Sequence, residues 1–139
     1  MFLLDTNVVS ELRTTRADRS VTTWAASIPA ASLFISVITV LELELGVRLL
    51  ERRDPRQGAA IRTWLEGHVL TAFAARILPV DIPVALECAR LHVPDRRAER
   101  DALIAATALV HGMTVVTRNT SDFSATSVPL LDPWSSRPT

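Results

Sequence analysis

The chain has 139 residues, of which 48% are hydrophobic, and its 15 acidic and 15 basic residues give a formal net charge of zero. This length and composition predict one globular domain over residues 1–139 and exclude a largely disordered chain. The balanced charge gives no general attraction for nucleic acid, so such a function would need a local site.

The first half of the chain alternates short apolar runs with helical patterns. The predicted elements are a buried parallel strand at residues 2–4, a helix at 21–28, a strand at 33–36, a helix from residue 39 and a second helix at 56–75. Residues 21–41 carry no charge over about the length of a membrane span. Pro29 and the serines and threonines in this stretch favour a helix, a turn and a strand instead, so we expect no membrane span.

The second half continues the alternation. Its predicted elements are strands at 77–80, 113–117 and 128–131 and helices at 83–92 and 98–111, with Gly112 as the C-terminal stop of the last helix. Strands that alternate with helices, without hairpin signals, predict an α/β fold in which helices cover a parallel sheet.

Cysteine and histidine give no sign of a metal site in the sequence. Cys88 is the single cysteine, which excludes an intrachain disulfide and fits a cytoplasmic location. Its apolar helical surroundings predict a core residue. The three histidines show no zinc-ligand spacing, so we expect structural or surface roles for them.

Four carboxylates lie where predicted elements begin or end. Asp5 directly follows the first strand, and Asp122 comes just after strand 113–117. Sites in open parallel sheets form beyond the carboxyl ends of the strands, so both are expected at that edge. Glu42 and Asp101 occupy the first turns of predicted helices, which can face the same crevice.

Each carboxylate also has a purely structural interpretation. Asp5 and Asp122 could cap the turns that follow them, and Asp101 could favour the positive end of its helix. Thr39 and Glu42 match a capping box. Four converging carboxylates would repel one another and resist ionisation, and a bound cation would remove that penalty. Oxygen-only ligands suit Mg²⁺ or Mn²⁺, so their joint placement favours a metal site.

Other kinds of phosphate chemistry fit less well. None of the four glycines follows the first strand, which argues against a phosphate-binding glycine loop. The haloacid-dehalogenase pattern requires an aspartate where this chain has Asn7, and a response-regulator receiver requires a lysine, which the chain lacks.

Four segments in order along the chain resemble the motifs of PIN-domain proteins. They are residues 3–11, residues 36–43 with Gly46, residues 101–108 and residues 117–123. The closing residues 131–134, Leu-Asp-Pro-Trp, resemble the tail of FitB-like and VapC-like members. One such motif would be weak, whereas four at suitable spacing are specific.

This resemblance implies a three-layer α/β/α fold with a central parallel sheet of four or five strands, and a homodimer. It also implies a Mg²⁺-dependent or Mn²⁺-dependent endoribonuclease that hydrolyses RNA phosphodiester bonds as the toxin of a toxin–antitoxin pair. Asp5, Glu42 and Asp101 match the family's acidic metal ligands, with Asp5 and Asp101 as the principal ones. Either Asp122 or Asn119 completes the set.

The resemblance also suggests roles for the neighbours of the acidic residues. Thr6 and Thr117 are expected to hold the carboxylates by hydrogen bonds, and Asn119 to orient a water molecule. Arg118, together with the arginines that precede the third motif, either grips RNA or forms a solvated helix face. Those arginines are Arg96, Arg97 and Arg100.

An alternative from another functional class is a catalytically weak PIN-like interaction protein that binds RNA or an antitoxin. The antitoxin would cover the acidic crevice and link the assembly to DNA, and the apolar helices over residues 39–75 could supply the dimer or antitoxin groove. Metal-dependent turnover distinguishes the two hypotheses, and the intact acidic set favours the enzyme.

Overall fold

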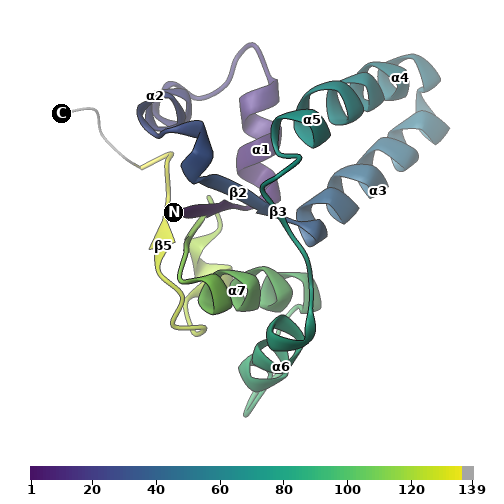
Figure 1. Cartoon of the computed structure of the whole chain (residues 1–139). Helices are drawn as coiled ribbons and strands as arrows, with labels where there is room; N and C mark the ends of the chain where they lie inside the picture. Colours follow the sequence, from purple (N-terminus) through teal and green to yellow (C-terminus); the bar gives the residue numbers. More distant parts are fainter. Residues whose placement is uncertain (136–139) are drawn as a thin grey trace.

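The computed structural model describes residues 1–135 and has a parallel sheet at its centre (Figure 1). The strands of this part of the chain are β1 (Phe2–Leu4), β2 (Leu33–Ser36), β3 (Ile77–Leu78), β4 (Thr114–Val116) and β5 (Leu130–Leu131). They lie in the order β3-β2-β1-β4-β5, and every pairing between neighbours is parallel. The first strand of the sequence therefore lies in the middle of the sheet.

Helices cover both faces of this sheet. They are α1 (Thr6–Arg13), α2 (Arg19–Ser27), α3 (Val37–Arg53), α4 (Pro55–Trp64), α5 (Leu70–Ala72), α6 (Ile82–Leu91) and α7 (Glu99–His111). Figure 1 shows α6 and α7 on one face and α1, α2 and α5 on the other. Short turns of 3₁₀-helix cover Ala30–Ser32 (η1) and Thr120–Phe123 (η3), and a π-helical turn, Leu65–Val69 (η2), joins α4 to α5.

The alternation of side chains along the strands divides the hydrophobic core into two layers. Leu3 and Val115 point into the core formed with α6 and α7, whereas Leu4 and Val116 point into the core formed with α1, α3 and η2. All four side chains are fully or almost fully buried. Successive strand residues face opposite sides of a sheet, so two-sided burial explains why these strands are continuous apolar runs. The predicted three-layer α/β/α fold is confirmed.

Most predicted elements are present with shifted ends. The third, fourth and fifth strands are shorter than predicted, because only the residues that pair with a neighbour form the ladder. The helix predicted over 56–75 is interrupted by the π-helical turn. Residues 21–41 form α2, η1, β2 and the start of α3, as the helix, turn and strand expected there. Gly112 ends α7 with φ at +66°, a conformation that favours glycine.

None of the helices within residues 1–135 is both long enough and apolar enough to cross a membrane.

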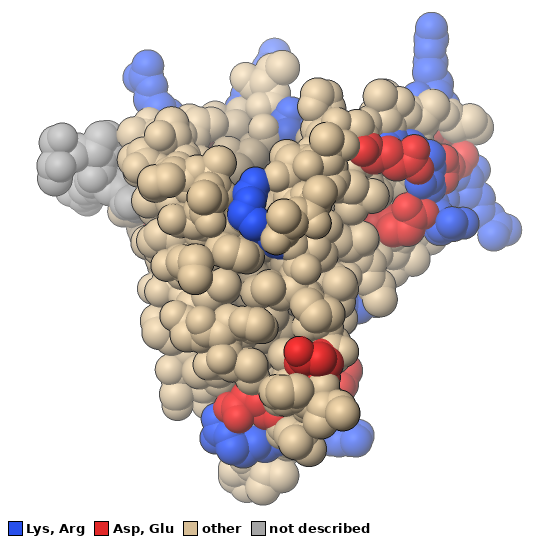
Figure 2. Space-filling view, in the orientation of Figure 1, with Lys and Arg blue, Asp and Glu red and all other residues tan. Residues whose placement is uncertain are grey.

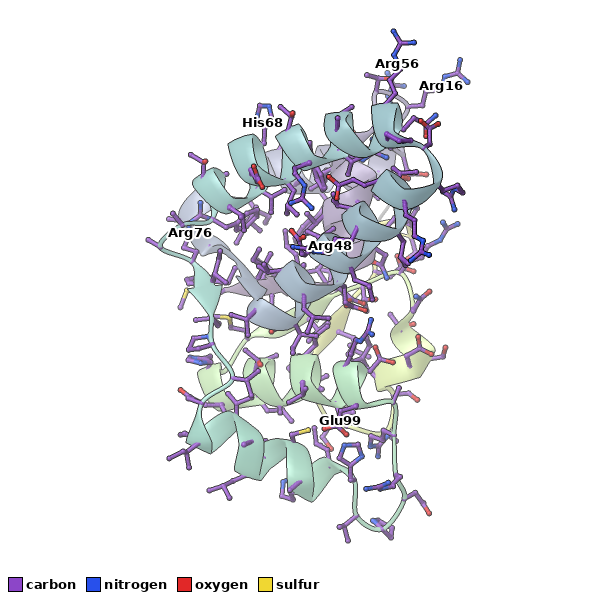
Figure 3. The ribbon with its side chains drawn as sticks, turned by 90° about the vertical axis from the view of Figure 1, so that its right-hand side faces the viewer. Arg16, Arg48, Arg56, His68, Arg76 and Glu99 are labelled. Carbon is purple, nitrogen blue, oxygen red and sulfur yellow. The ribbon has the colours of Figure 1, made fainter. Side chains whose placement is uncertain are left out.

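The helices α3 and α4 form a hairpin closed by an ionic network. Arg62 of α4 donates hydrogen bonds to Glu44 and Glu51 of α3 at 2.8–3.0 Å and to Glu66 at 3.2 Å. Figure 2 shows acidic and basic side chains side by side where this hairpin lies, and Figure 3 shows the two helices along each other. The hairpin also needs close approach, because a Cβ atom at Gly58 would lie 2.5 Å from Cα of Glu51.

This close approach predicts opposite effects for two glycine-to-alanine changes. Gly58→Ala should lower the free energy of unfolding by about 1–3 kcal/mol, because the new methyl group meets the backbone of α3. Gly46→Ala is the matched control: it also lies within a helix, but a Cβ atom added there would meet nothing within 4 Å. It should raise the free energy of unfolding by about 0.5–1 kcal/mol through helix propensity. Urea unfolding followed by circular dichroism tests both, and stabilisation by Gly58→Ala would contradict the close packing.

Candidate active site

The strand order reverses its direction between β1 and β4, so the carboxyl ends of these two strands form the switch point of the sheet. The chain adds β2 and β3 on one side of β1 and then β4 and β5 on its other side. Ligands of open α/β sheets bind where the order reverses in this way. The backbone N–H of Asp5 donates to the carbonyl of Val116 at 2.9 Å, so the residues that follow these two strands meet directly.

Asp5 is the buried centre of this edge, with 7% of its surface exposed. It is the N-cap of α1, and its Oδ1 accepts a hydrogen bond from the backbone N–H of Thr6 at 2.8 Å. The capping interpretation is therefore correct for this residue, but its second oxygen, Oδ2, faces the site and accepts a bond from the hydroxyl of Thr117 at 2.8 Å. Capping and a site role are compatible here.

Thr117 is fully buried and its hydroxyl joins three segments. While it donates to Asp5, it accepts hydrogen bonds from the side-chain amide of Asn7 at 3.3 Å and from the backbone N–H of Asn119 at 3.0 Å. A hydroxyl with one donor bond and two acceptor bonds has no free capacity. The orientation of the Asp5 carboxylate is thus fixed by residues from α1 and from the segment after β4.

Glu42 of α3 is held by the first residue of α1. Its Oε1 accepts a hydrogen bond from the hydroxyl of Thr6 at 2.7 Å, and its Oε2 lies 3.5 Å from the guanidinium of Arg100. The capping box predicted for Thr39 and Glu42 is wrong. Ser36 caps α3 instead, through a bond from the backbone N–H of Ile38, and its position three residues upstream leaves Glu42 free to turn toward α1.

Asp101 and Asp122 complete the group from α7 and η3. Burial, together with the negative charges of Asp122, Asp5 and Glu42, raises the pKa of Asp101 to about 6. Burial is also the main cause that raises the pKa of Asp5, an effect that its hydrogen bonds from Thr117 and Thr6 oppose. The structure therefore brings all four predicted carboxylates close enough for their negative charges to contribute to the raised pKa of Asp5 and Asp101.

The acidic group fits a hard divalent cation in its chemistry. Asp101 and Asp122 offer carboxylates that accept no hydrogen bond from any residue within 1–135. Within residues 1–135, no three of the four carboxylates bring one oxygen atom each to within 4.8 Å of one another. The ligand atoms of Cys88, His92 and Glu99 do meet this criterion. Mg²⁺ usually binds through one or two carboxylates and keeps several waters, so it requires no tighter set.

The predicted RNA-binding arginines differ in their surroundings. Arg118 places its guanidinium over the ring of Trp134, 5.2 Å from the ring centre, and Arg100 lies beside Glu42. Arg97 donates to the carbonyl oxygens of Leu91 and Ala125, which ties down the segment before α7. Arg118 and Arg100 are thus better placed than Arg97 to meet a ligand at the acidic group.

Asn7 belongs to the site, although no role was predicted for it from the sequence. Its side-chain amide donates to Asp5 as well as to Thr117, both at 3.3 Å, and its Oδ1 accepts a hydrogen bond from the backbone N–H of Arg118. Its position two residues after Asp5, in the first turn of α1, is the signal that could have identified it. Asn119 contributes its backbone N–H to Thr117, and its side chain makes no hydrogen bond within residues 1–135.

Comparison with known proteins gives a consistent result over the whole chain. Residues 2–128 match the family profile described as PIN domain. The chain is 37% identical to the VapC ribonuclease Y4jK of Sinorhizobium fredii, over 96% of this chain and 98% of that protein. It is 40% identical to the toxin FitB of Neisseria gonorrhoeae, over 96% and 99%. The solved structure of FitAB bound to an IR36 DNA fragment superposes with a TM-score of 0.89 at 38% identity, over 99% of this chain and 98% of that chain.

The raised pKa of Asp101 predicts that Asp101→Asn stabilises the protein in EDTA. A carboxyl whose folded pKa is about 6 contributes stability below pH 4, and this contribution is lost as the pH rises from about 4 to about 6. The asparagine would not ionise, so the variant should exceed the wild type by about 1 kcal/mol at pH 7, after allowance for solvent screening. The difference should shrink toward pH 4. Urea unfolding at several pH values measures it, and a difference independent of pH would contradict the repulsion.

Proposed function

The chain belongs to the PIN-domain family, and we propose that it is a metal-dependent endoribonuclease that hydrolyses RNA phosphodiester bonds as the toxin of a toxin–antitoxin pair. The observation that carries the proposal is the meeting of four carboxylates beyond β1 and β4, where burial and mutual repulsion raise the pKa of Asp5 and Asp101. Such a group is unfavourable in a protein that does not use it. The ribonuclease and toxin names of its relatives support the same activity.

Asp5, Asp101 and Glu42 would hold Mg²⁺ or Mn²⁺, with Asp5 and Asp101 as the direct ligands. The cation would neutralise charge on the scissile phosphate and favour ionisation of an attacking water. Thr117 and Asn7 orient Asp5 by hydrogen bonds, and Thr6 orients Glu42. Ligands fixed in this way need little rearrangement on binding, which favours a precise geometry.

Asp122 and the arginines act on the substrate side of the site. The carboxylate of Asp122 is exposed and accepts no hydrogen bond from residues 1–135, so it is available to orient a water molecule or to accept its proton. Arg100 and Arg118 would bind phosphates on either side of the cleaved bond, since guanidinium groups bind phosphate oxygens in a bidentate way. With a net charge of zero, these local cations supply the attraction for RNA.

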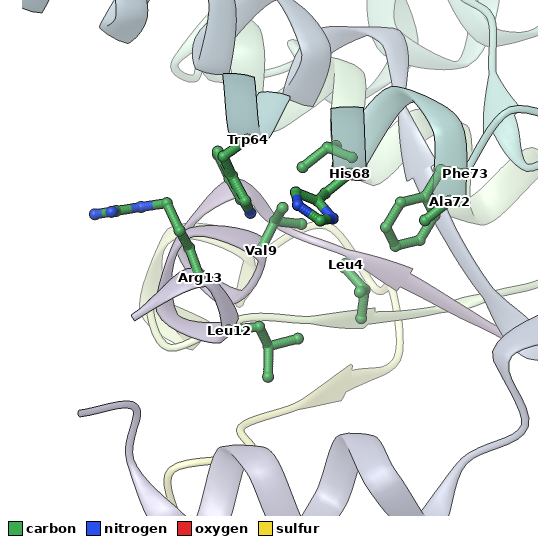
Figure 4. Close-up of a pocket in the computed structure, with 9 residues that line it drawn as sticks. Leu4, Val9, Leu12, Arg13, Trp64, His68, Ala72 and Phe73 are labelled. Atoms are coloured by element: carbon green, nitrogen blue, oxygen red, sulfur yellow. The ribbon is translucent and has the colours of Figure 1, made fainter. Parts of the chain in front are cut away.

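An apolar hollow between α1 and the α4–η2–α5 segment would receive the antitoxin (Figure 4). It has a volume of about 170 Å³, and its lining includes Leu4, Leu12, Trp64 and Phe73. Figure 4 shows Trp64, His68 and Phe73 across from Leu12 and Arg13. An apolar side chain on an antitoxin segment fits this hollow, and the antitoxin would link the assembly to DNA. The FitAB structure on DNA supports such an assembly.

A second copy of the chain would cover the exposed face of α3. Leu41, Leu45 and Leu49 recur at intervals of four residues and are 47%, 39% and 60% exposed. Residues four apart lie on one side of a helix, so these leucines form a continuous apolar stripe. A stripe of this kind typically marks a protein interface, and we place the homodimer contact there.

Metal-dependent cleavage of RNA tests the proposal. The purified protein, freed of antitoxin, should cut total cellular RNA at discrete positions in Mg²⁺ and not in EDTA, and Asp101→Asn should lower the rate by about 100-fold or more. Asp54→Asn is the matched control, because Asp54 follows the last residue of α3, about 25 Å along the helix from its start, and asparagine can keep its capping bond. Absence of cleavage by folded wild-type protein in Mg²⁺ or Mn²⁺ would favour a binding role.

The hydrogen bond from Thr117 to Asp5 predicts a second effect on cleavage. Thr117→Val keeps the shape of the buried side chain but removes this bond, and it should lower the cleavage rate about 10–100-fold. Thr107→Val is the control, since Thr107 is equally buried and its hydroxyl donates only to the carbonyl of Leu103 in its own helix. Single-turnover cleavage rates of the two variants test this prediction, and circular dichroism checks that both are folded. Equal rates would mean that Thr117 does not position Asp5.

A further inference from the structure

We propose that Cys88, His92 and Glu99 form a zinc-binding site at the corner between α6 and α7, separate from the acidic group. Cys88 lies in the last turns of α6, His92 follows that helix directly, and Glu99 is the first residue of α7. Figure 3 shows Glu99 between the start of α7 and the end of α6. The sequence alone did not indicate this group, because Glu99 comes from the next helix.

The distances among the three side chains suit a common metal ion. The donor atoms all lie within 4.8 Å of one another. Sγ of Cys88 is 3.8 Å from Oε1 of Glu99, and Nε2 of His92 is 3.1 Å from Oε2 of the same carboxylate. Zinc binds sulfur, nitrogen and oxygen at about 2.0–2.3 Å, which sets the donors about 3.3–3.8 Å apart in a tetrahedron. The observed separations are close to that range.

Nε2 of His92 provides an independent indication of a ligand. This atom is buried and has no hydrogen-bond partner within residues 1–135. Glu99 is near enough, at 3.1 Å, but its oxygen lies outside the geometry of a hydrogen bond. Ligands of one metal ion have this arrangement, because they are directed at a shared centre and not at one another. Buried polar atoms without partners are rare in folded proteins, and a metal ion would satisfy this one.

The ligand atoms of Cys88, His92 and Glu99 favour a different metal ion than the acidic group does. A thiolate, an imidazole and a carboxylate suit Zn²⁺, whereas carboxylates alone suit Mg²⁺ or Mn²⁺. Water would take the fourth position, since the carboxylate side of the group is open, with the side chain of Glu99 70% exposed. Cys88 is buried and reaches the group from the core.

Binding requires one local change at His92. Its Nδ1 accepts a hydrogen bond from the backbone N–H of Arg97 at 3.1 Å, so the ring proton is on Nε2 in the metal-free protein. Coordination through Nε2 moves this proton to Nδ1, and the N–H of Arg97 must then turn away. Arg97 would remain attached through its side chain, which donates to the carbonyl oxygens of Leu91 and Ala125.

A metal ion here would brace the helix that carries Asp101. Glu99 and Asp101 both lie in the first turn of α7. The ion would join this turn to the end of α6, in place of the weaker contacts of the metal-free cluster. The site would therefore add to stability without taking part in the chemistry at the acidic group.

Cobalt(II) absorption tests this site in the full chain. Metal-free protein with excess Mg²⁺ at the acidic group should take up one Co²⁺ with a near-ultraviolet thiolate charge-transfer band, which Zn²⁺ should abolish by displacement. Cys88→Ser should lose the band, and His92→Gln and Glu99→Gln should weaken Co²⁺ binding about 10-fold or more. His111→Gln, an exposed histidine at the end of α7, and Asp101→Asn should leave it unchanged.

Two results would overturn the site. One is the absence of a thiolate band in wild-type protein whose circular dichroism shows it to be folded. The other is wild-type Co²⁺ affinity in both His92→Gln and Glu99→Gln. If Cys88→Ser fails to fold, Glu99→Gln still decides the outcome, because its side chain is mostly exposed and its change should not disturb the core. RNA cleavage is not a readout here, so failure of this site leaves the proposed ribonuclease untouched.

Discussion

The hydrogen bond from the hydroxyl of Thr117 to the carboxylate of Asp5 is the contact on which the rest of the site depends. It joins the residues that follow β4 and β1, the two strands between which the sheet reverses its order. Asn7 and Asn119 are arranged around the same hydroxyl, so α1 and the segment after β4 take their positions from it. A buried carboxylate requires such donors, because an unpaired charge away from water is costly.

The carboxylates that surround Asp5 destabilise this part of the protein when no cation is bound. Asp101 and Asp122 approach Asp5 from α7 and η3 without compensating donors within residues 1–135, and burial together with repulsion raises the pKa of Asp101 to about 6. The acidic group thus lowers the stability of the protein at the edge of the sheet. The two apolar layers and the α3–α4 hairpin stabilise the fold. This distribution is typical of functional sites, where local preferences are set aside for chemistry. A bound cation would recover the lost stability.

The sheet and the carboxylates could be predicted well from the sequence, because both depend on local patterns. Apolar runs such as residues 2–4 mark strands buried on two faces, and Asp5 follows directly from the end of such a run. The capping box at Thr39 failed because Ser36 competes for the same helix end and Glu42 binds Thr6, 36 residues away in sequence. Contacts between distant residues have no local signature, and the same reason hid the contact of Asn7 with Thr117 and that of Glu99 with Cys88.

Binding of Mn²⁺ to the metal-free protein, followed by electron paramagnetic resonance, would show whether the acidic group is a metal site. Mn²⁺ can replace Mg²⁺ at oxygen ligands, and the loss of its free-ion signal counts the bound ions. We expect at least one Mn²⁺ per chain in the wild type, and binding weakened about 10-fold or more in Asp5→Asn and Asp101→Asn. Asp54→Asn should bind as the wild type does. Equal binding by all four proteins, or none by the wild type, would contradict a metal site at the edge of the sheet.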